Sequence, residues 1–121
     1  MKQPDIFVIG TASLDVLHLA DGRTVRAAGG AGLYTALAAR KVGAVAGLFA
    51  PKPAELPPAL AGAARQIAWI GPQIPAADLP RLEIAHHGQG QATLLDASWG
   101  AEAQLTPAAM PAVVAQSAWV H

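Results

Sequence analysis

Two unbroken apolar segments flank an alanine-rich segment with helical spacing, and this order constrains the fold more than any other feature. The segments "IFVI" (residues 6–9) and "AVAGLFA" (residues 44–50) are typical of strands buried on both faces of a parallel sheet. Between them, residues 31–42 place Leu33 and Leu37 on one helical face. A strand, a helix and a second strand predict a right-handed parallel crossover and an α/β fold.

Two further pairs of segments have the pattern of β-hairpins. The first pair turns at Asp21-Gly22 and the second at "GQG" (residues 88–90), which are turn-forming sequences. The predicted hairpin strands are residues 13–21, 23–27, 81–87 and 91–97. These hairpins predict a small β element beside the main sheet.

The remaining apolar segments continue the alternation of helix and strand. Thr106 and Pro107 are typical of a helix start, and Pro111 is expected to shorten or bend the helix that follows. The predicted elements are helices 55–66 and 106–116, a proline-rich connection 71–80, a strand at 67–70 and a further strand beginning in "SAWVH" (117–121). Because the sequence stops as a strand begins, we expect a partial chain.

Composition and charge narrow the classes of function. The 121 residues are 53% hydrophobic and 13% charged, which suits one domain over residues 1–121. Eight basic residues balance eight acidic ones without a basic stripe, so no nucleic-acid partner is expected. Without cysteine the chain has no disulfide, which fits a reducing compartment. Asp5 interrupts any signal-peptide pattern, and the apolar region 31–50 is too short and too charged for the roughly 20 residues of a membrane span. We expect a cytoplasmic protein with no membrane partner.

The glycine pair Gly29-Gly30 precedes the alanine-rich helix. Glycine costs about 1 kcal/mol relative to alanine inside a helix, so backbone conformation or close approach must explain the pair. In one interpretation the bare main chain lies against a ligand, which the free N–H groups of the helix start also bind. In the other the pair only makes a tight strand-to-helix turn. The spacing matches neither the dinucleotide fingerprint nor the phosphate-binding loop, and both interpretations stay open.

Together these motifs resemble the N-terminal part of the ribokinase-like sugar and nucleoside kinases, the PfkB family. "FVIGTASLDVLHL" (7–19), a hairpin and "AGGAGLYTALAARKVGA" (28–44) follow the family's order. The segment 79–111 and the final "AWVH" (118–121) are similar to the family's lid strands, the "LTP" motif and helix after them, and a strand that ends in a histidine. The resemblance covers nearly the whole chain. It implies a three-layer Rossmann-like ribokinase-type sheet with a small β lid over approximately 13–27 and 81–97.

The resemblance implies an enzyme that transfers the γ-phosphoryl group of ATP, with Mg²⁺, to a hydroxymethyl group of a sugar or nucleoside. Asp15 occupies the position that hydrogen-bonds substrate hydroxyls, and Gly29 and Gly30 occupy the pair that lies against the substrate. Tyr34 stands where the family often has asparagine, so the acceptor is expected to differ from ribose. His86 is a further candidate that would face the substrate from the lid.

One family signature is absent from the sequence. No "GAGD"-like segment with the catalytic-base aspartate and glycine-rich anion hole is present, so no catalytic residue and no residue for ATP or Mg²⁺ is assigned. The chain alone is therefore expected not to catalyse. His86 and His87 are adjacent on a predicted strand and point to opposite faces, which argues against a shared metal.

Two other functions are kept as alternatives. The chain could be a non-catalytic sugar- or nucleoside-binding module, or a nucleotide-binding Rossmann-type domain. The glycine spacing argues against the second of these. In the family that the sequence resembles, the lid can form a dimer interface, which implies a homodimer through the lid.

Overall fold

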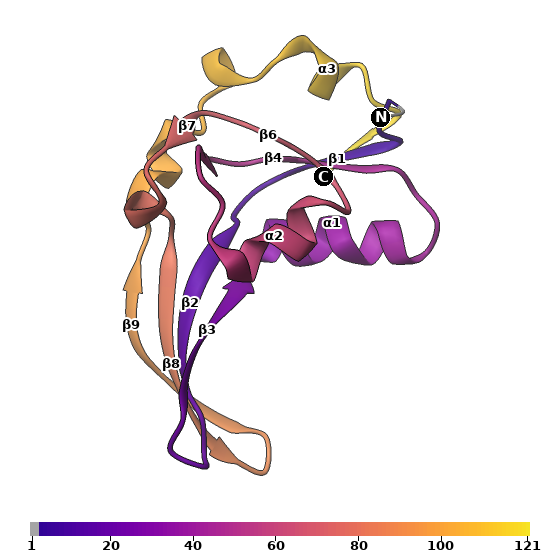
Figure 1. The fold of residues 1–121 in the computed structure, drawn as a ribbon. Coiled ribbons are helices and arrows are strands. Elements are labelled where there is room, and N and C mark those ends of the chain that lie inside the picture. The colour runs from indigo at the N-terminus through magenta and orange to yellow at the C-terminus, as the bar shows by residue number, and fades with distance from the viewer. Residues whose placement is uncertain (1–2) are drawn as a thin grey trace.

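Two four-stranded sheets organise residues 3–121, which are the residues that this computed structural model describes (Figure 1). The body sheet has the order β10-β1-β4-β6, and all its neighbouring strands are parallel. Its strands are β1 (Ile6–Ile9), β4 (Ala46–Phe49), β6 (Ala68–Ile70) and β10 (Trp119–Val120). The predicted parallel pairing of the segments on either side of the first helix is confirmed.

Helices cover both faces of the body sheet. Helices α1 (Ala31–Lys41) and α2 (Pro58–Ala64) lie on one face, and α3 (Ala112–Ala115) lies on the other (Figure 1). Alternate strand residues serve the two faces, because successive side chains of a strand point in opposite directions. Val8 packs in the cluster beneath α1, whereas the adjacent Phe7 packs with Val114 of α3. The chain therefore has the expected three-layer α/β architecture.

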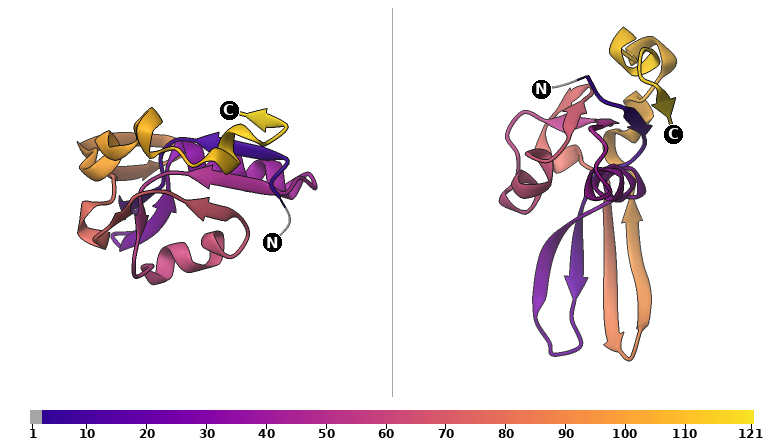
Figure 2. Two further views of the ribbon diagram at one scale, coloured as in Figure 1. Left: turned by 90° about the horizontal axis from the view of Figure 1, so that it is seen from above. Right: turned by 90° about the vertical axis from the view of Figure 1, so that its right-hand side faces the viewer.

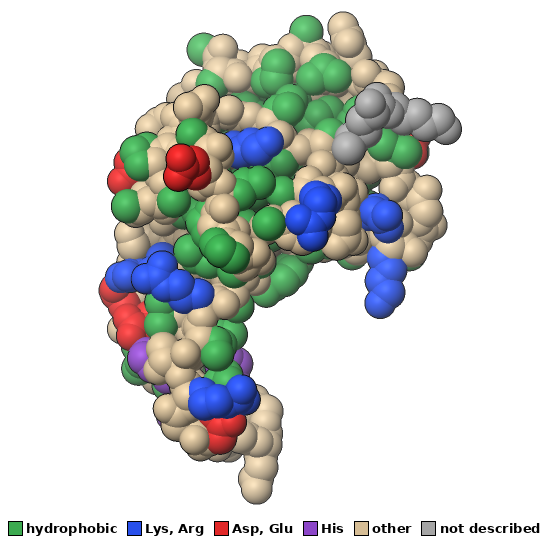
Figure 3. All heavy atoms as spheres, viewed as in Figure 1, with side chains coloured by type: hydrophobic (Ala, Val, Ile, Leu, Met, Phe, Trp, Pro, Cys, Tyr) green, Lys and Arg blue, Asp and Glu red, His purple; other side chains and the backbone are tan. Residues whose placement is uncertain are grey.

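The second sheet, which we call the lid sheet, has the order β3-β2-β8-β9. Its strands are β2 (Ser13–His18), β3 (Thr24–Gly29), β8 (Arg81–Gly88) and β9 (Gln91–Ser98). Each predicted hairpin forms an antiparallel pair, and β2 joins β8 in parallel between them. The hairpins project side by side from the body (Figure 2), and in the space-filling view they form a narrow arm beneath it (Figure 3).

The predicted hairpin turns are confirmed by their backbone conformations. Gly22 has a φ of 90°, and Gly88 and Gly90 also have positive φ. At the first turn, the Asp21 carboxylate accepts hydrogen bonds from the main chain and the side chain of Arg23. These bonds hold the pKa of Asp21 below its usual range.

The predicted single helix over residues 106–116 is wrong. The segment forms a short 3₁₀ turn, η3 (Pro107–Ala109), followed after an extended break by α3. Pro111 explains the break, because proline has no N–H and disfavours helical geometry in the residue before it. Thr106 is the expected N-cap, since its Oγ1 accepts a hydrogen bond from Ala109 N at 3.3 Å.

The structure contains short elements that the sequence did not predict, two of them, β7 (Gln73–Ile74) and η1 (Ala76–Asp78), in the proline-rich connection between β6 and β8. A two-residue strand β5 (Lys52–Pro53) pairs in parallel with β7. Two further 3₁₀ turns, η1 and η2 (Gly100–Gln104), precede and follow the second lid hairpin. Within residues 3–121, no helix has the length and apolar character needed to cross a membrane.

Replacing Phe49 with alanine should destabilise the fold. Phe49 is 2% exposed and packs with Phe7 and Val114, so its loss would leave a cavity between the sheet and α3. We expect a loss of about 3–5 kcal/mol in the free energy of unfolding, measured by urea titration. Val42→Ala, at a side chain that is 86% exposed, is the control and should change little. Equal losses in the two variants would contradict the assigned core.

Candidate functional site

Asp15 lies buried where three strands of the lid sheet meet. It belongs to β2, pairs in register with Ala27 of β3, and is only 6% exposed. Its Oδ1 accepts a hydrogen bond of 2.9 Å from the main-chain N–H of Leu82 on β8. The carboxylate therefore connects the two hairpins at the base of the lid, as a buried charged group with a defined partner.

Close packing around Asp15 explains why residue 29 is glycine. A Cβ atom added to Gly29 would overlap Oδ2 of Asp15 and would lie 2.8 Å from Oγ of Ser13. Gly30 has a φ of 100°, and an added Cβ would overlap the carbonyl oxygen of Thr11. The glycine pair thus makes the tight strand-to-helix turn of the second interpretation, and the same turn brings bare main chain beside the Asp15 carboxylate.

A cavity of about 200 Å³ lies beside this turn. Its walls include Ser13, the main chain of Gly30 and Ala31 at the start of α1, Leu82 and Trp99. Ser13 is 2% exposed, and its hydroxyl has no hydrogen-bond partner among residues 3–121. A buried polar group without a partner costs about 1–3 kcal/mol, so a hydroxyl-bearing ligand in the cavity would recover that loss.

Ser13 is a candidate that the sequence analysis missed. It precedes Asp15 by two residues on the same strand, so both side chains lie on one face of the lid sheet. That spacing was visible in the sequence and would have identified Ser13 once residues 13–21 were taken as a strand.

A second missed interaction closes the edge of the site. The Thr11 hydroxyl donates a 2.8 Å hydrogen bond to Oε1 of Glu102, which belongs to η2 after the lid. The other carboxylate oxygen of Glu102, Oε2, is buried and has no partner among residues 3–121. Since 91 positions separate the two residues, no local pattern could have indicated this contact.

Tyr34 lies in the first turn of α1, next to the glycine pair. Its hydroxyl donates a hydrogen bond of 3.0 Å to the main-chain oxygen of Ala28, and its side chain is 59% exposed. The donor of this hydroxyl is thus used within the protein, whereas its oxygen can still accept a hydrogen bond. Tyr34 as a substrate contact stays a prediction.

His86 lies toward the far end of the lid. It pairs with Ala92 and is exposed, and the β2–β8 pairing ends one residue before it, at Ala85. His86 is four positions along the strand from Leu82, which corresponds to roughly 13 Å. The structure therefore does not bring His86 to Asp15, and its role stays a prediction for a ligand that extends along the lid.

Comparison with known proteins identifies the architecture. No protein-family model matches the sequence, and no curated protein matches it. Among solved structures, ribokinase from Giardia lamblia has a TM-score of 0.79 at 21% identity, over 98% of this chain and 41% of its own. Adenosine kinase from Sinorhizobium meliloti has a TM-score of 0.76 at 20% identity, over 98% of this chain and 46% of its own.

The chain has the fold of the N-terminal part of a ribokinase-type kinase. A third match, ribokinase from Cryptococcus neoformans in complex with ADP, has a TM-score of 0.63 at 14% identity, over 78% of this chain and 34% of its own. The chain thus spans less than half the length of these ribokinase-type structures. The resemblance seen in the sequence motifs is confirmed at the level of the fold.

Replacing Gly30 with alanine should destabilise the ribokinase-type turn. A side chain at a φ of 100° is strained and would also meet the Thr11 carbonyl, so we expect a loss of about 1–3 kcal/mol or more. Gly62→Ala is a matched control, because Gly62 lies inside α2 and its added Cβ would have no neighbour closer than 3.9 Å. That control should gain up to about 1 kcal/mol. Denaturant unfolding measures both, and a stabilised Gly30→Ala variant would refute the assigned conformation.

Proposed function

We propose that this chain forms the substrate-binding part of an ATP-dependent kinase that phosphorylates a hydroxymethyl group of a sugar or nucleoside. The observation that carries the proposal is that the side chains of Asp15 and Ser13 are both buried on one face of the lid sheet, beside the glycine turn. The ribokinase and adenosine kinase folds matched above support the kinase class.

The site offers the groups that a polyhydroxy compound needs. A carboxylate accepts hydrogen bonds from hydroxyls and makes them stronger than neutral bonds, whereas a serine hydroxyl both donates and accepts. Asp15 uses one oxygen for the Leu82 N–H, which fixes the carboxylate and directs Oδ2 toward Gly29. Ser13 and the main chain of Gly30 line the cavity directly, and the Asp15 carboxylate lies next to them against Gly29.

The binding site of the phosphoryl donor would require ligands for Mg²⁺ in addition to the substrate-binding groups. ATP with Mg²⁺ would supply the transferred phosphoryl group, and Mg²⁺ in such sites is held by one or two carboxylates together with the phosphates. Among residues 3–121, no three acidic or histidine side chains gather as metal ligands would. No residue for ATP or Mg²⁺ is therefore assigned among the described residues, and no transfer step is derived from them.

Substrate binding can be tested by calorimetric titration of the chain with ribose, fructose and adenosine, with NAD⁺ as the comparison ligand. Asp15→Asn keeps an oxygen for Leu82 but turns an amide donor toward Gly29, so binding should weaken about tenfold or more. Ser13→Ala should also weaken binding without loss of stability, because its hydroxyl has no protein partner to lose.

Asp78→Asn is the control, because Asp78 is exposed and does not line the Ser13 cavity. It should leave the affinity unchanged. Tight binding of NAD⁺ with no response to the three polyhydroxy compounds would instead favour a nucleotide-binding domain. Polyol binding that survives Asp15→Asn unchanged would remove Asp15 from the site.

We propose further that the lid sheet pairs with a second copy of the chain. An apolar row crosses all four lid strands on the face that carries Asp15, because the register places its members opposite one another. The row consists of Val25, Leu17, Ile84 and Leu94. Leu94 is 59% exposed, and a second lid would remove this row from water.

Sedimentation velocity tests the dimer. Leu94→Glu should convert the dimer to monomer, because it places a charge in the apolar row. Thr93→Glu, at the neighbouring exposed position and therefore on the opposite face, should leave the dimer intact. A wild-type chain that stays monomeric as its concentration rises would exclude this interface.

A further inference from the structure

A second cavity, of about 340 Å³, lies on the other face of the lid sheet. Leu14 and Arg26 line it, and each is offset by one residue from the Asp15–Ala27 pair that belongs to the Asp15 face. The short segment around η1, including Leu79, forms the opposite wall. Arg81 and Ser98 border both cavities, so the two cavities meet at this end of β8 and β9.

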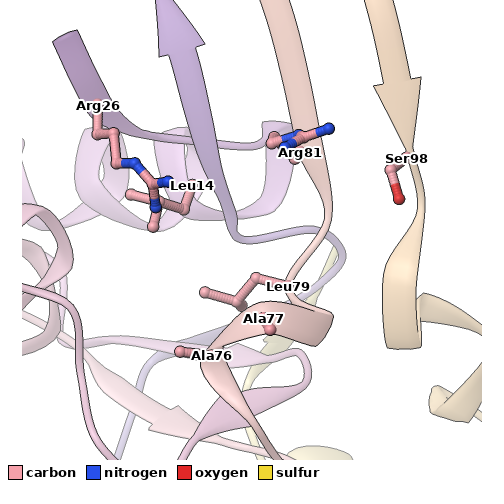
Figure 4. Close-up of a pocket in the computed structure, with 7 residues that line it drawn as sticks. All are labelled: Leu14, Arg26, Ala76, Ala77, Leu79, Arg81 and Ser98. Atoms are coloured by element: carbon pink, nitrogen blue, oxygen red, sulfur yellow. The ribbon is translucent and has the colours of Figure 1, made fainter.

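Two arginines from distant parts of the chain border this second cavity. Figure 4 shows the Arg26 side chain lying beside Leu14, and the Arg81 side chain extending toward Ser98. Arg26 is exposed and forms no ion pair or side-chain hydrogen bond with any of residues 3–121. Arg81 lies 3.7 Å from Asp96, which is longer than a strong charge-assisted hydrogen bond.

The acidic groups on this face do not neutralise both arginines. Glu83 neighbours Val16 in the parallel register, and its Oε1 lies at hydrogen-bond distance, 2.7 Å, from Nε2 of His18. Among residues 3–121, Asp96 pairs with Arg81 and not with Arg26, and its 3.7 Å distance leaves donors of the Arg81 guanidinium free to bond elsewhere. Arg26 therefore retains the full donor capacity of a planar guanidinium, which suits phosphate and carboxylate groups.

A third cavity is also lined by two arginines, but these two differ from Arg26 and Arg81 in their electrostatic surroundings. This hollow of about 410 Å³ lies at the other end of the body, and its arginines are Arg40 and Arg65. Arg40 lies in the last turn of α1 and Arg65 directly follows α2. At these positions the partial negative charge of the helix carbonyls already offsets the arginine charge, whereas Arg26 and Arg81 lie on strands without such an offset.

We propose that the cavity between Arg26 and Arg81 binds a small molecule that carries a phosphate or carboxylate group. The guanidinium groups bind the oxyanion, the Ser98 hydroxyl donates or accepts a further hydrogen bond, and Leu14 and Leu79 contact the carbon part of the ligand. The volume is within the range of small-molecule sites. This site lies on the opposite face of the lid sheet from Asp15 and adjoins the Ser13 cavity of the proposed function at Arg81 and Ser98.

Isothermal titration with inorganic phosphate and with glycerol 3-phosphate, at constant ionic strength, tests the proposal. Arg26→Gln and Arg81→Gln should each weaken binding about tenfold, since each removes a charge-assisted donor. Asp96→Asn should tighten binding, because it removes the competing partner of Arg81. Arg40→Gln is the matched control and should bind as the unmodified chain does.

The two probes and one further variant separate the outcomes. Equal affinity for both probes assigns recognition to the oxyanion alone, whereas tighter binding of glycerol 3-phosphate adds the apolar wall, and both support the proposal. No saturable binding of either probe, or equal effects of Arg26→Gln and Arg40→Gln, would overturn it. Loss of phosphate binding in Ser13→Ala with Arg26→Gln unaffected would also overturn it, by placing the anion in the Ser13 cavity.

Discussion

The hydrogen bond from the Leu82 amide to the Asp15 carboxylate is the interaction on which the lid and the candidate site depend. The regular register between β2 and β8 begins at Val16 and Glu83, one residue after Asp15 and Leu82. The Asp15 side chain therefore accepts the hydrogen bond of the Leu82 N–H, which directly precedes the regular pairing. A carboxylate buried to this degree needs such a partner. Once it is fixed there, Oδ2 leaves room only for glycine at position 29, and the start of α1 follows directly.

The same arrangement explains why the sequence could not decide between the two interpretations of the glycine pair. A tight turn and a close ligand approach both require residues without a Cβ atom. The neighbours that exclude a side chain at Gly29 come from Ser13 and Asp15 across the hairpin, which only the folded register brings together. The packing accounts for the turn, and the cavity beside it is where a ligand would use the same bare main chain.

Elements with strong local signals could be predicted from the sequence. The apolar strands, the Asp-Gly and Gly-Gln-Gly turns, the Thr106 cap and the alanine-rich helix each depend on neighbouring residues. The pairing of β5 with β7 could not be predicted, because two-residue strands carry no periodicity. The Thr11–Glu102 contact and the convergence of Arg26 with Arg81 could not be predicted either, because their partners come from distant strands and turns.

Within residues 3–121, the chain passes between the body and the lid four times: from β1 to β2, from β3 to α1, from η1 to β8, and from β9 to η2. A segment joined to a body by one connection can rotate by changing two backbone dihedral angles. The lid sheet has four connections, so its rotation requires correlated changes at each of them. Gly30 and Gly100 hold positive φ at two of the four. Any rotation of the lid sheet against the body would therefore have to involve all four connections together, and one of these connections leads directly into the first turn of α1.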